Sequence, residues 1–267
     1  MMHTFLEKWG RTIEVRWSQL MTYRLNFILQ VFGPAVVFFF IKYNLWSSIY
    51  GDDPTSIIQG YDFQAMIAYQ VWVLMIQLLG QGNDSMNLAE DIRLGRISSY
   101  LIYPFDFWKF HTAGFLAFQG LQLLLCATLL ICVSSVGLLA ELQWKHLLMG
   151  LSLTFLVGGL WFTLQYMVGL MAFWLEETWI LRVMLMILSQ FLSGAILPLE
   201  LYPQWVREIL FYSPFPYLTY LPAKVFMGSG ELFANAVVVI VTWTLIMAGI
   251  CTFIWKRGLR LYTAAGM

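Results

Sequence analysis

The chain contains six long stretches from which Asp, Glu, Lys and Arg are all absent. These apolar stretches occupy residues 25–41, 63–83, 110–140, 147–175, 183–199 and 232–255. A helix crosses the hydrocarbon of a bilayer with about 20 mostly apolar residues, and stretches of this kind supply them. The pattern therefore predicts six transmembrane helices, with spans at about 25–49, 62–82, 108–134, 146–173, 180–198 and 232–255.

The overall composition agrees with a membrane protein and excludes several other classes. Apolar residues make up 60% of the 267 residues and charged residues 11%, whereas soluble domains average about 45–50% and about 25%. The 15 cationic side chains equal the 15 acidic ones, so no basic field exists for nucleic acid. Runs such as LQLLLCATLLIC (residues 121–132) lack the alternation of a β-barrel strand. We therefore expect an all-α membrane protein in which residues 1–267 form one transmembrane domain.

The distribution of cations predicts the orientation of the spans, because Lys and Arg accumulate in cytoplasmic segments. A cytoplasmic N-terminus places 11 of the 15 lysines and arginines inside, namely Lys8, Arg11, Arg16, Arg24, Arg93, Arg96, Lys109, Arg182, Lys256, Arg257 and Arg260. The four outside are Lys42, Lys145, Arg207 and Lys224. We expect a multi-pass protein of the cell membrane with both termini in the cytoplasm.

Residues 2–22 precede the first span and have the pattern of an amphipathic helix. Their apolar side chains (Phe5, Leu6, Trp9, Ile13, Trp17 and Leu20) fall on one helical face, which also carries Arg16. Such a helix lies in the membrane interface, with its Trp side chains at headgroup level and its cations near anionic lipid. The simpler alternative is a juxtamembrane anchor without a mechanical role.

The predicted spans carry no group suited to catalysis or ion coupling. The sequence contains no HExxH or GxSxG motif, and its three histidines lack metal-ligand spacing. The central part of each span has no Asp, Glu, Lys or Arg, although a coupled transporter normally needs such a residue. We therefore expect a protein that is not an enzyme and binds no metal.

Glutamine is the polar residue that does enter the predicted spans. Gln70, Gln77 and Gln81 share one helical face. The other glutamines in the spans are Gln119, Gln122, Gln165 and Gln190. These side chains either make hydrogen bonds between helices, which is the simpler interpretation, or line a translocation path or a subunit seam.

Residues 84–103 form a charged segment on the predicted inner side. Asn83 or Asp84 is a suitable N-cap for a short helix that runs to about Leu94, and Gly95 is a suitable C-terminal stop. A short charged helix on a membrane-embedded frame is suited to docking a soluble partner. The alternative is a solvated loop helix with no partner.

Residues 199–228, on the predicted outer side, are unusual for a loop because they are apolar and aromatic. Five of the eight prolines lie at 198–222 and divide the segment into pieces near 203–212 and 216–227, each too short to span. Broken backbone at membrane depth has to be buried in protein or line a cavity. We predict a re-entrant or interfacial helical hairpin between the fifth and sixth spans.

Taken together, these segments resemble the ABC-2-type permeases, the membrane subunits of bacterial ATP-binding-cassette exporters. The inner sequence DIRLGRISSYLIYP (residues 91–104) is similar to the family's charged coupling stretch. The sequence LSGAILP (192–198), with the later Tyr202-Pro203, Ser213-Pro214-Phe215-Pro216 and Met227-Gly228, is similar to the pattern that follows the family's fifth span. The order and spacing of these motifs, after an amphipathic N-terminal helix, carry the resemblance over nearly the whole chain.

The resemblance implies a mechanism and a set of functional residues. Two permease subunits, identical or related, pair and dock on two ATPase subunits, which bind the ATP and magnesium, and the complex exports a substrate across a bacterial inner membrane. The chain has no GxxxxGK[ST] motif, as expected of a subunit that hydrolyses no ATP itself. The coupling contacts are expected at Glu90, Asp91, Arg93, Gly95, Arg96 and Ile97, with Glu176 and Glu177 as secondary contacts. The outer gate is expected at Gly194, Pro198, Pro203, Pro214 and Pro216.

Two alternatives remain open from the residues alone. One is a secondary transporter or channel that works without a partner, and the other is a non-transporting membrane scaffold. A lone transporter predicts activity without nucleotide, and a scaffold predicts no substrate-dependent ATPase stimulation.

Overall fold

The computed structural model describes residues 2–22, 24–51, 56–81, 86–97, 107–135 and 143–261. The regular secondary structure of these residues is helical. The elements are α1 (Met2–Thr22), α2 (Arg24–Tyr50), α3 (Phe63–Gly80), α4 (Met86–Arg93), α6 (Phe107–Ser135), α7 (Trp144–Leu170), η1 (Met171–Phe173), α8 (Trp179–Leu192), η2 (Leu199–Leu201), α9 (Gln204–Phe211), α10 (Phe215–Leu218), α11 (Tyr220–Phe226), η3 (Gly230–Leu232) and α12 (Phe233–Leu261).

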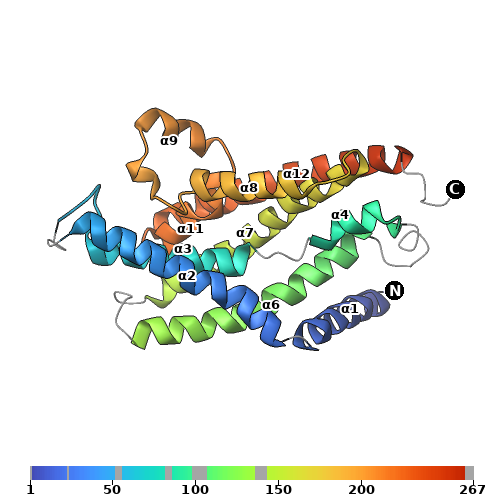
Figure 1. Ribbon diagram of the computed structural model, residues 1–267, viewed down its shortest axis with the longest axis horizontal. Coiled ribbons are helices and arrows are strands. Elements are labelled where there is room, and N and C mark those ends of the chain that lie inside the picture. The colour runs from blue at the N-terminus through green and yellow to red at the C-terminus, as the bar shows by residue number, and fades with distance from the viewer. Residues whose placement is uncertain are drawn as a thin grey trace.

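The long helices run roughly along the longest axis of the molecule and leave two distinct ends (Figure 1). One end carries α1, α4 and the end of α12, and we name it the α4 end. The other end carries α9 and the rest of residues 193–228, which we name the hairpin. Helix α7 packs along α12, and α3 contacts α2, α6, α7 and α11. The charged segment at 86–97 and the proline-rich hairpin therefore lie at opposite ends.

Four helices in the described part of the chain are long and apolar enough to cross a membrane. They are Phe63–Gly80, Phe107–Thr128, Trp144–Phe173 and Gly230–Arg260, and they coincide with the second, third, fourth and sixth predicted spans. The first predicted span coincides with α2, a helix of 27 residues that exposes Phe38, Phe40 and Ile41. Six spans therefore remain the prediction, with four of them supported by length and composition.

The fifth predicted span, 180–198, is shorter as a helix than expected. Helix α8 has 14 residues and ends at Leu192, which at about 1.5 Å per residue is about 21 Å, less than the hydrocarbon thickness. Gly194 follows with φ +79. A Cβ at this position would lie 3.0 Å from Cβ of Tyr220 and 3.1 Å from the Tyr69 hydroxyl, so the turn requires glycine for both conformation and space.

Helix α3 is the most enclosed of the long helices. Residues 66–73 are all buried, and Trp72 stacks on Phe226 of α11 with ring centroids 4.3 Å apart. A helix that is apolar on every side belongs in the interior of a bundle. The hairpin thus packs directly against the central helix.

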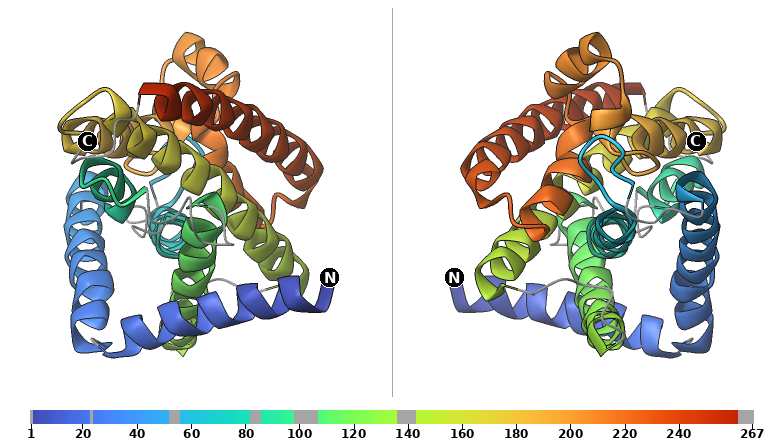
Figure 2. Two further views of the ribbon diagram at one scale, coloured as in Figure 1. Left: turned by 90° about the vertical axis from the view of Figure 1, so that its right-hand side faces the viewer. Right: turned by 90° about the vertical axis from the view of Figure 1, so that its left-hand side faces the viewer.

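Helix α1 turns sharply away from α2 and crosses α6 (Figure 2). The ring of Trp17 packs against Gly120, where an added Cβ would lie 3.1 Å from the ring. The guanidinium of Arg16 lies 4.4 Å from the centroid of the Phe110 ring, so a cation–π contact explains why a cation occupies the apolar face. The face that the sequence assigns to membrane contact is thus used in part to hold α1 on α6.

Candidate functional site

Helix α4 is a short helix with a well-formed C-terminus. It ends at Arg93, and Gly95 adopts φ +72. The amide of Gly95 donates to the carbonyl of Ile92 (3.2 Å), and the amide of Arg96 donates to the carbonyl of Asp91 (2.9 Å). This pair of bonds is a Schellman motif, which only a residue that tolerates positive φ completes without strain. The motif turns the chain back so that Ile97 enters the protein interior.

The apolar side of α4 anchors it in the bundle. Leu88, Ile92 and Ile97 are buried in one cluster that also includes residues of α6, α7 and α12, among them Phe107, Tyr166, Leu170 and Cys251. Leu88 rests on Gly169 of α7, where an added Cβ would lie 3.1 Å from Cγ of Leu88. Helix α4 therefore packs directly on α7 and η1, and the same cluster connects α7 to α6 and α12.

The charged side of α4 faces outward. The side chains of Glu90, Arg93 and Arg96 are 47%, 51% and 53% exposed. The Asp91 side chain is only 6% exposed; its carboxylate lies 3.2 Å from Nη1 of Arg96 and 3.7 Å from Nε2 of His111. Of the predicted coupling residues, Glu90, Arg93 and Arg96 are accessible, while Asp91 and Ile97 point inward and Gly95 forms the turn.

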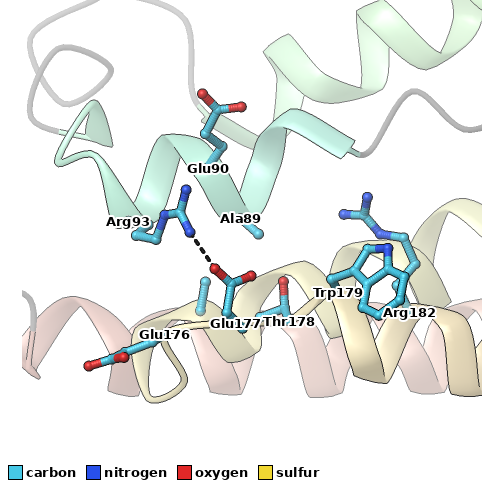
Figure 3. A pocket seen from close by; sticks show the side chains of 9 residues that line it. Ala89, Glu90, Arg93, Glu176, Glu177, Thr178, Trp179 and Arg182 are labelled. Carbon is cyan, nitrogen blue, oxygen red and sulfur yellow. Dashed lines mark hydrogen bonds and ion pairs between the residues drawn. The ribbon is translucent and has the colours of Figure 1, made fainter.

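The segment that precedes α8 meets α4 across an open cleft. Nη1 of Arg93 lies 2.7 Å from Oε1 of Glu177, and this ion pair joins the end of α4 to the segment before α8, 84 residues away in sequence (Figure 3). The cleft, of about 140 Å³, is also lined by Glu90, Trp179 and Arg182. Glu176 points away from Arg93 (Figure 3). The structure thus brings the predicted coupling residue Arg93 together with the secondary residue Glu177. Residues 84, 85 and 98–103 of the predicted coupling segment lie outside the described residues.

At the other end of the molecule, four consecutive backbone carbonyls after α8 each accept a hydrogen bond from a different residue. The carbonyl of Ser193 accepts from the amide of Tyr220 (3.0 Å). Those of Gly194, Ala195 and Ile196 accept from the Tyr69 hydroxyl (2.7 Å), Nζ of Lys42 (2.7 Å) and Nε2 of Gln70 (3.4 Å). Carbonyls beyond a helix end need such partners where water is excluded. Helices α2, α3 and α11 therefore hold the 193–196 turn in place.

A charged cluster lies next to this turn. Oε1 of Glu200 lies 3.0 Å from Nζ of Lys224 and accepts hydrogen bonds from the hydroxyls of Tyr220 (2.8 Å) and Tyr61 (3.2 Å). Nζ of Lys224 also donates to the Tyr61 hydroxyl (3.0 Å). Burial raises the pKa of Glu200, but the hydrogen bonds from Tyr220 and Lys224 outweigh it, so the pKa lies below its ordinary value. Glu200 is therefore ionised at neutral pH.

Sequence reasoning did not identify this cluster. The available signal was that Lys42 and Lys224 are isolated cations in apolar segments, and that Glu200 ends the charge-free stretch 183–199. Spacing alone cannot pair Tyr61 with Glu200, which is 139 residues away.

The residues predicted for the outer gate have clear local roles. Gly194 permits the turn after α8. Pro198, Pro203 and Pro214 are the residues immediately before η2, α9 and α10, and Pro216 lies in the first turn of α10, a position that tolerates the missing amide hydrogen. The prolines therefore break the hairpin into short helices, near the predicted pieces 203–212 and 216–227.

The glutamines of the predicted spans connect elements. Nε2 of Gln119 in α6 donates to the carbonyl of Leu79 in α3 (3.1 Å), as interhelical hydrogen bonding predicts. Gln70 and Gln81 both donate to the hairpin, at Ile196 and Thr219. The remaining side chains are buried at Gln122 and Gln165 and partly buried at Gln77 and Gln190. One face of α3, extended by Gln81, thus binds the hairpin through side-chain hydrogen bonds.

These features define a polytopic helical membrane protein that exposes a charged helix at one end. Among the residues that the structure describes, no group of three or more His, Cys, Asp or Glu is placed to hold a metal ion. The chain belongs to the ABC-2 family: a family model described as ABC-2 family transporter protein matches residues 25–266. It is therefore a membrane transport component of the ABC transporter class, and this membership implies a partner ABC ATPase. Comparison with curated proteins and with solved structures finds no match.

Proposed function

We propose that the chain is the permease subunit of an ABC exporter in a bacterial inner membrane. Two permease subunits, identical or related, pair and dock on two separate ATPase subunits, which bind ATP and magnesium. The termini and α4 lie on the cytoplasmic side, where most of the cations are, and the hairpin lies on the outer side as a re-entrant segment. Residues 2–22 lie at the inner membrane interface.

The observation that carries this proposal is the two-sided character of α4. Its apolar side is fixed among α6, α7 and α12, and its charged side is accessible through Glu90, Arg93 and Arg96. Charged side chains on a rigid support provide specificity and fast association with a soluble partner. A partner that binds this side and then moves displaces the inner end of α7 directly, and those of α6 and α12 through the shared cluster.

The ion pair between Arg93 and Glu177 gives this movement a second route. Glu177 lies two residues before α8, and α8 leads directly to the 193–196 turn of the hairpin. An exposed ion pair contributes about 0.2–1 kcal/mol, so it aligns α4 with the segment before α8 more than it stabilises the fold. ATP-driven motion at the α4 end thereby reaches the hairpin through α8.

The test is charge reversal on the accessible side of α4, in Glu90→Lys together with Arg93→Glu. Asp91 is excluded because its carboxylate is buried and its reversal would disturb the fold. We expect the variant to insert into the membrane normally but to lose the ATPase subunit when the tagged permease is purified, and with it substrate-stimulated ATP hydrolysis.

Arg207→Glu together with Glu208→Lys is the matched control, because it reverses one cation and one anion in α9 at the opposite end. It should retain the ATPase. Equal retention by both double variants would refute docking at α4. ATPase capture without substrate-dependent stimulation would indicate a scaffold instead, and transport by the purified chain without nucleotide would indicate a secondary transporter.

A further inference from the structure

Stability alone does not explain the ion pair between Glu200 and Lys224 in the hairpin. The side chains of Glu200 and Lys224 are 19% and 24% exposed, so both charges have given up most of their contact with water. Replacing a buried ion pair by well-packed apolar residues is often neutral or stabilising. A charged pair at this place therefore calls for a reason other than stability.

The pair is completed by a residue from outside the hairpin. The Tyr61 hydroxyl donates to Glu200 and accepts from Lys224, while the Lys224 ammonium lies 4.8 Å from the Tyr61 ring centroid. Tyr61 is held by a tight turn in which Gln59 and Gly60 have φ 49 and 89, and by the Tyr50 hydroxyl, which donates to its carbonyl (2.7 Å). The loop before α3 thus presents one preorganised hydroxyl to both charges.

The contacts join three separate segments at one point. Glu200 lies in η2, the first element of the hairpin after α8. Lys224 lies on α11, and Tyr61 precedes α3. Between η2 and α11 in the chain, α9 stands away from the bundle (Figure 1) and exposes Trp205 and Ile209. The cluster therefore closes the base of a hairpin whose far part is free of the bundle.

We propose that Glu200, Lys224 and Tyr61 form a latch that keeps the hairpin closed on α3, and that its release exposes the 193–196 turn to water on the hairpin side. Water can replace each hydrogen bond of a polar latch, so such a joint opens at a lower cost than apolar packing does. The use of the latch in export rests on the proposed function. Closure itself is a property of this chain.

Ser193 is a suitable reporter of closure. It is fully buried, and its hydroxyl has no hydrogen-bond partner, so Ser193→Cys removes no hydrogen bond and changes the side-chain volume little. The experiment labels intact cells with a membrane-impermeant maleimide, using the full chain and its complex on a Cys132→Ser background. The native thiol of Cys126 is buried in the same cluster as the hairpin and reports loosening of the whole fold.

We expect Glu200→Gln and Lys224→Met each to raise the labelling rate at position 193 about tenfold, because each leaves an unpaired partly buried charge or acceptor. Tyr61→Phe removes one hydroxyl and should raise the rate about fivefold. Exchange of the two charges, in Glu200→Lys with Lys224→Glu, should return the rate toward that of the reporter alone.

Glu208→Gln is the matched control, because Glu208 lies in the same hairpin but on its exposed side, bonded to Gln204. An unchanged rate in Glu200→Gln, or an equal rise in Glu208→Gln, would overturn the latch. If Glu200→Gln also exposes Cys126, the whole fold has loosened and the Tyr61→Phe variant becomes the test. An unchanged labelling rate at position 193 in Tyr61→Phe would then overturn the proposal. Retention of the ATPase is measured separately, so failure of the latch and failure of the permease assignment are distinguishable.

Discussion

Adding a single methyl group at Gly169 tests whether α4 transmits force through its contact with α7. A Cβ at this position would lie 3.1 Å from Cγ and 3.3 Å from Cβ of Leu88. Ordinary carbon contacts are about 3.5–4.0 Å, and Cβ of Leu88 cannot rotate away. Helix α4 must therefore move outward by about 0.2–0.7 Å.

The energetic cost has two opposing parts. Overpacking costs about 1–3 kcal/mol, while alanine in place of glycine stabilises a helix interior by up to about 1 kcal/mol. The free energy of unfolding should thus fall by about 0–3 kcal/mol, although the position of α4 changes. We expect Gly169→Ala to remain folded in the membrane and to lose most of its ATPase capture and stimulation.

A second substitution in Leu88 checks this explanation. Leu88→Ala alone costs about 2–5 kcal/mol because it leaves a cavity. In the double variant the added methyl at 169 fills part of that cavity, so the combined loss should be smaller than the sum by about 1–3 kcal/mol. Melting temperature and ATPase retention measure both effects.

Gly159→Ala is the control. Gly159 lies on the same helix as Gly169, but a Cβ added there meets nothing within 4 Å. If Gly169→Ala captured the ATPase as well as Gly159→Ala does, the contact between α4 and α7 would not be the transmission point. Additive losses in the double variant would likewise contradict the packing argument.

Two further outcomes follow from the contacts described above. Gly120→Leu should push the Trp17 ring off α6 and make residues before α2 more sensitive to protease in inverted vesicles, whereas Gly10→Leu, with open space around it, should not. Because the pKa of Glu200 is lowered in the folded chain, its carboxylate stabilises the fold above about pH 4.3 and loses this effect as the pH falls through the lowered pKa. The melting-temperature difference between the wild type and Glu200→Gln should therefore stay constant from about pH 8 to about pH 5 and shrink only below about pH 4. A decrease that begins above about pH 5 would contradict a lowered pKa of Glu200.

Much of the secondary structure was predictable because the membrane restricts the chain so strongly. Uncharged stretches long enough to cross a bilayer predict helices, and four of them are found as apolar helices of sufficient length. Prolines at 198, 203 and 214 predict breaks, and each directly precedes a new helix. These signals are local, so a single sequence contains them.

The end of α8 shows where this reasoning stops. An uncharged stretch that continues to 199 predicts a span to 198, but the helix ends at Leu192. Hydropathy does not detect this end, because the turn after it carries no charged side chain and its polarity lies mainly in its backbone. The carbonyls of that turn are satisfied by Lys42, Tyr69 and Gln70 from two other helices.

The sequence by itself determined four of the apolar helices, the charges of the segment at 84–103 and the family, because length, hydropathy and motif order are properties of the linear chain. Only the tertiary structure decided that Asp91 turns inward, that Arg93 pairs with Glu177, and that Glu200 meets both Lys224 and Tyr61. A buried polar group takes whichever partner the packing of distant helices brings within about 3 Å. The spacing of residues along the chain does not predict which polar groups of distant helices come into such contact.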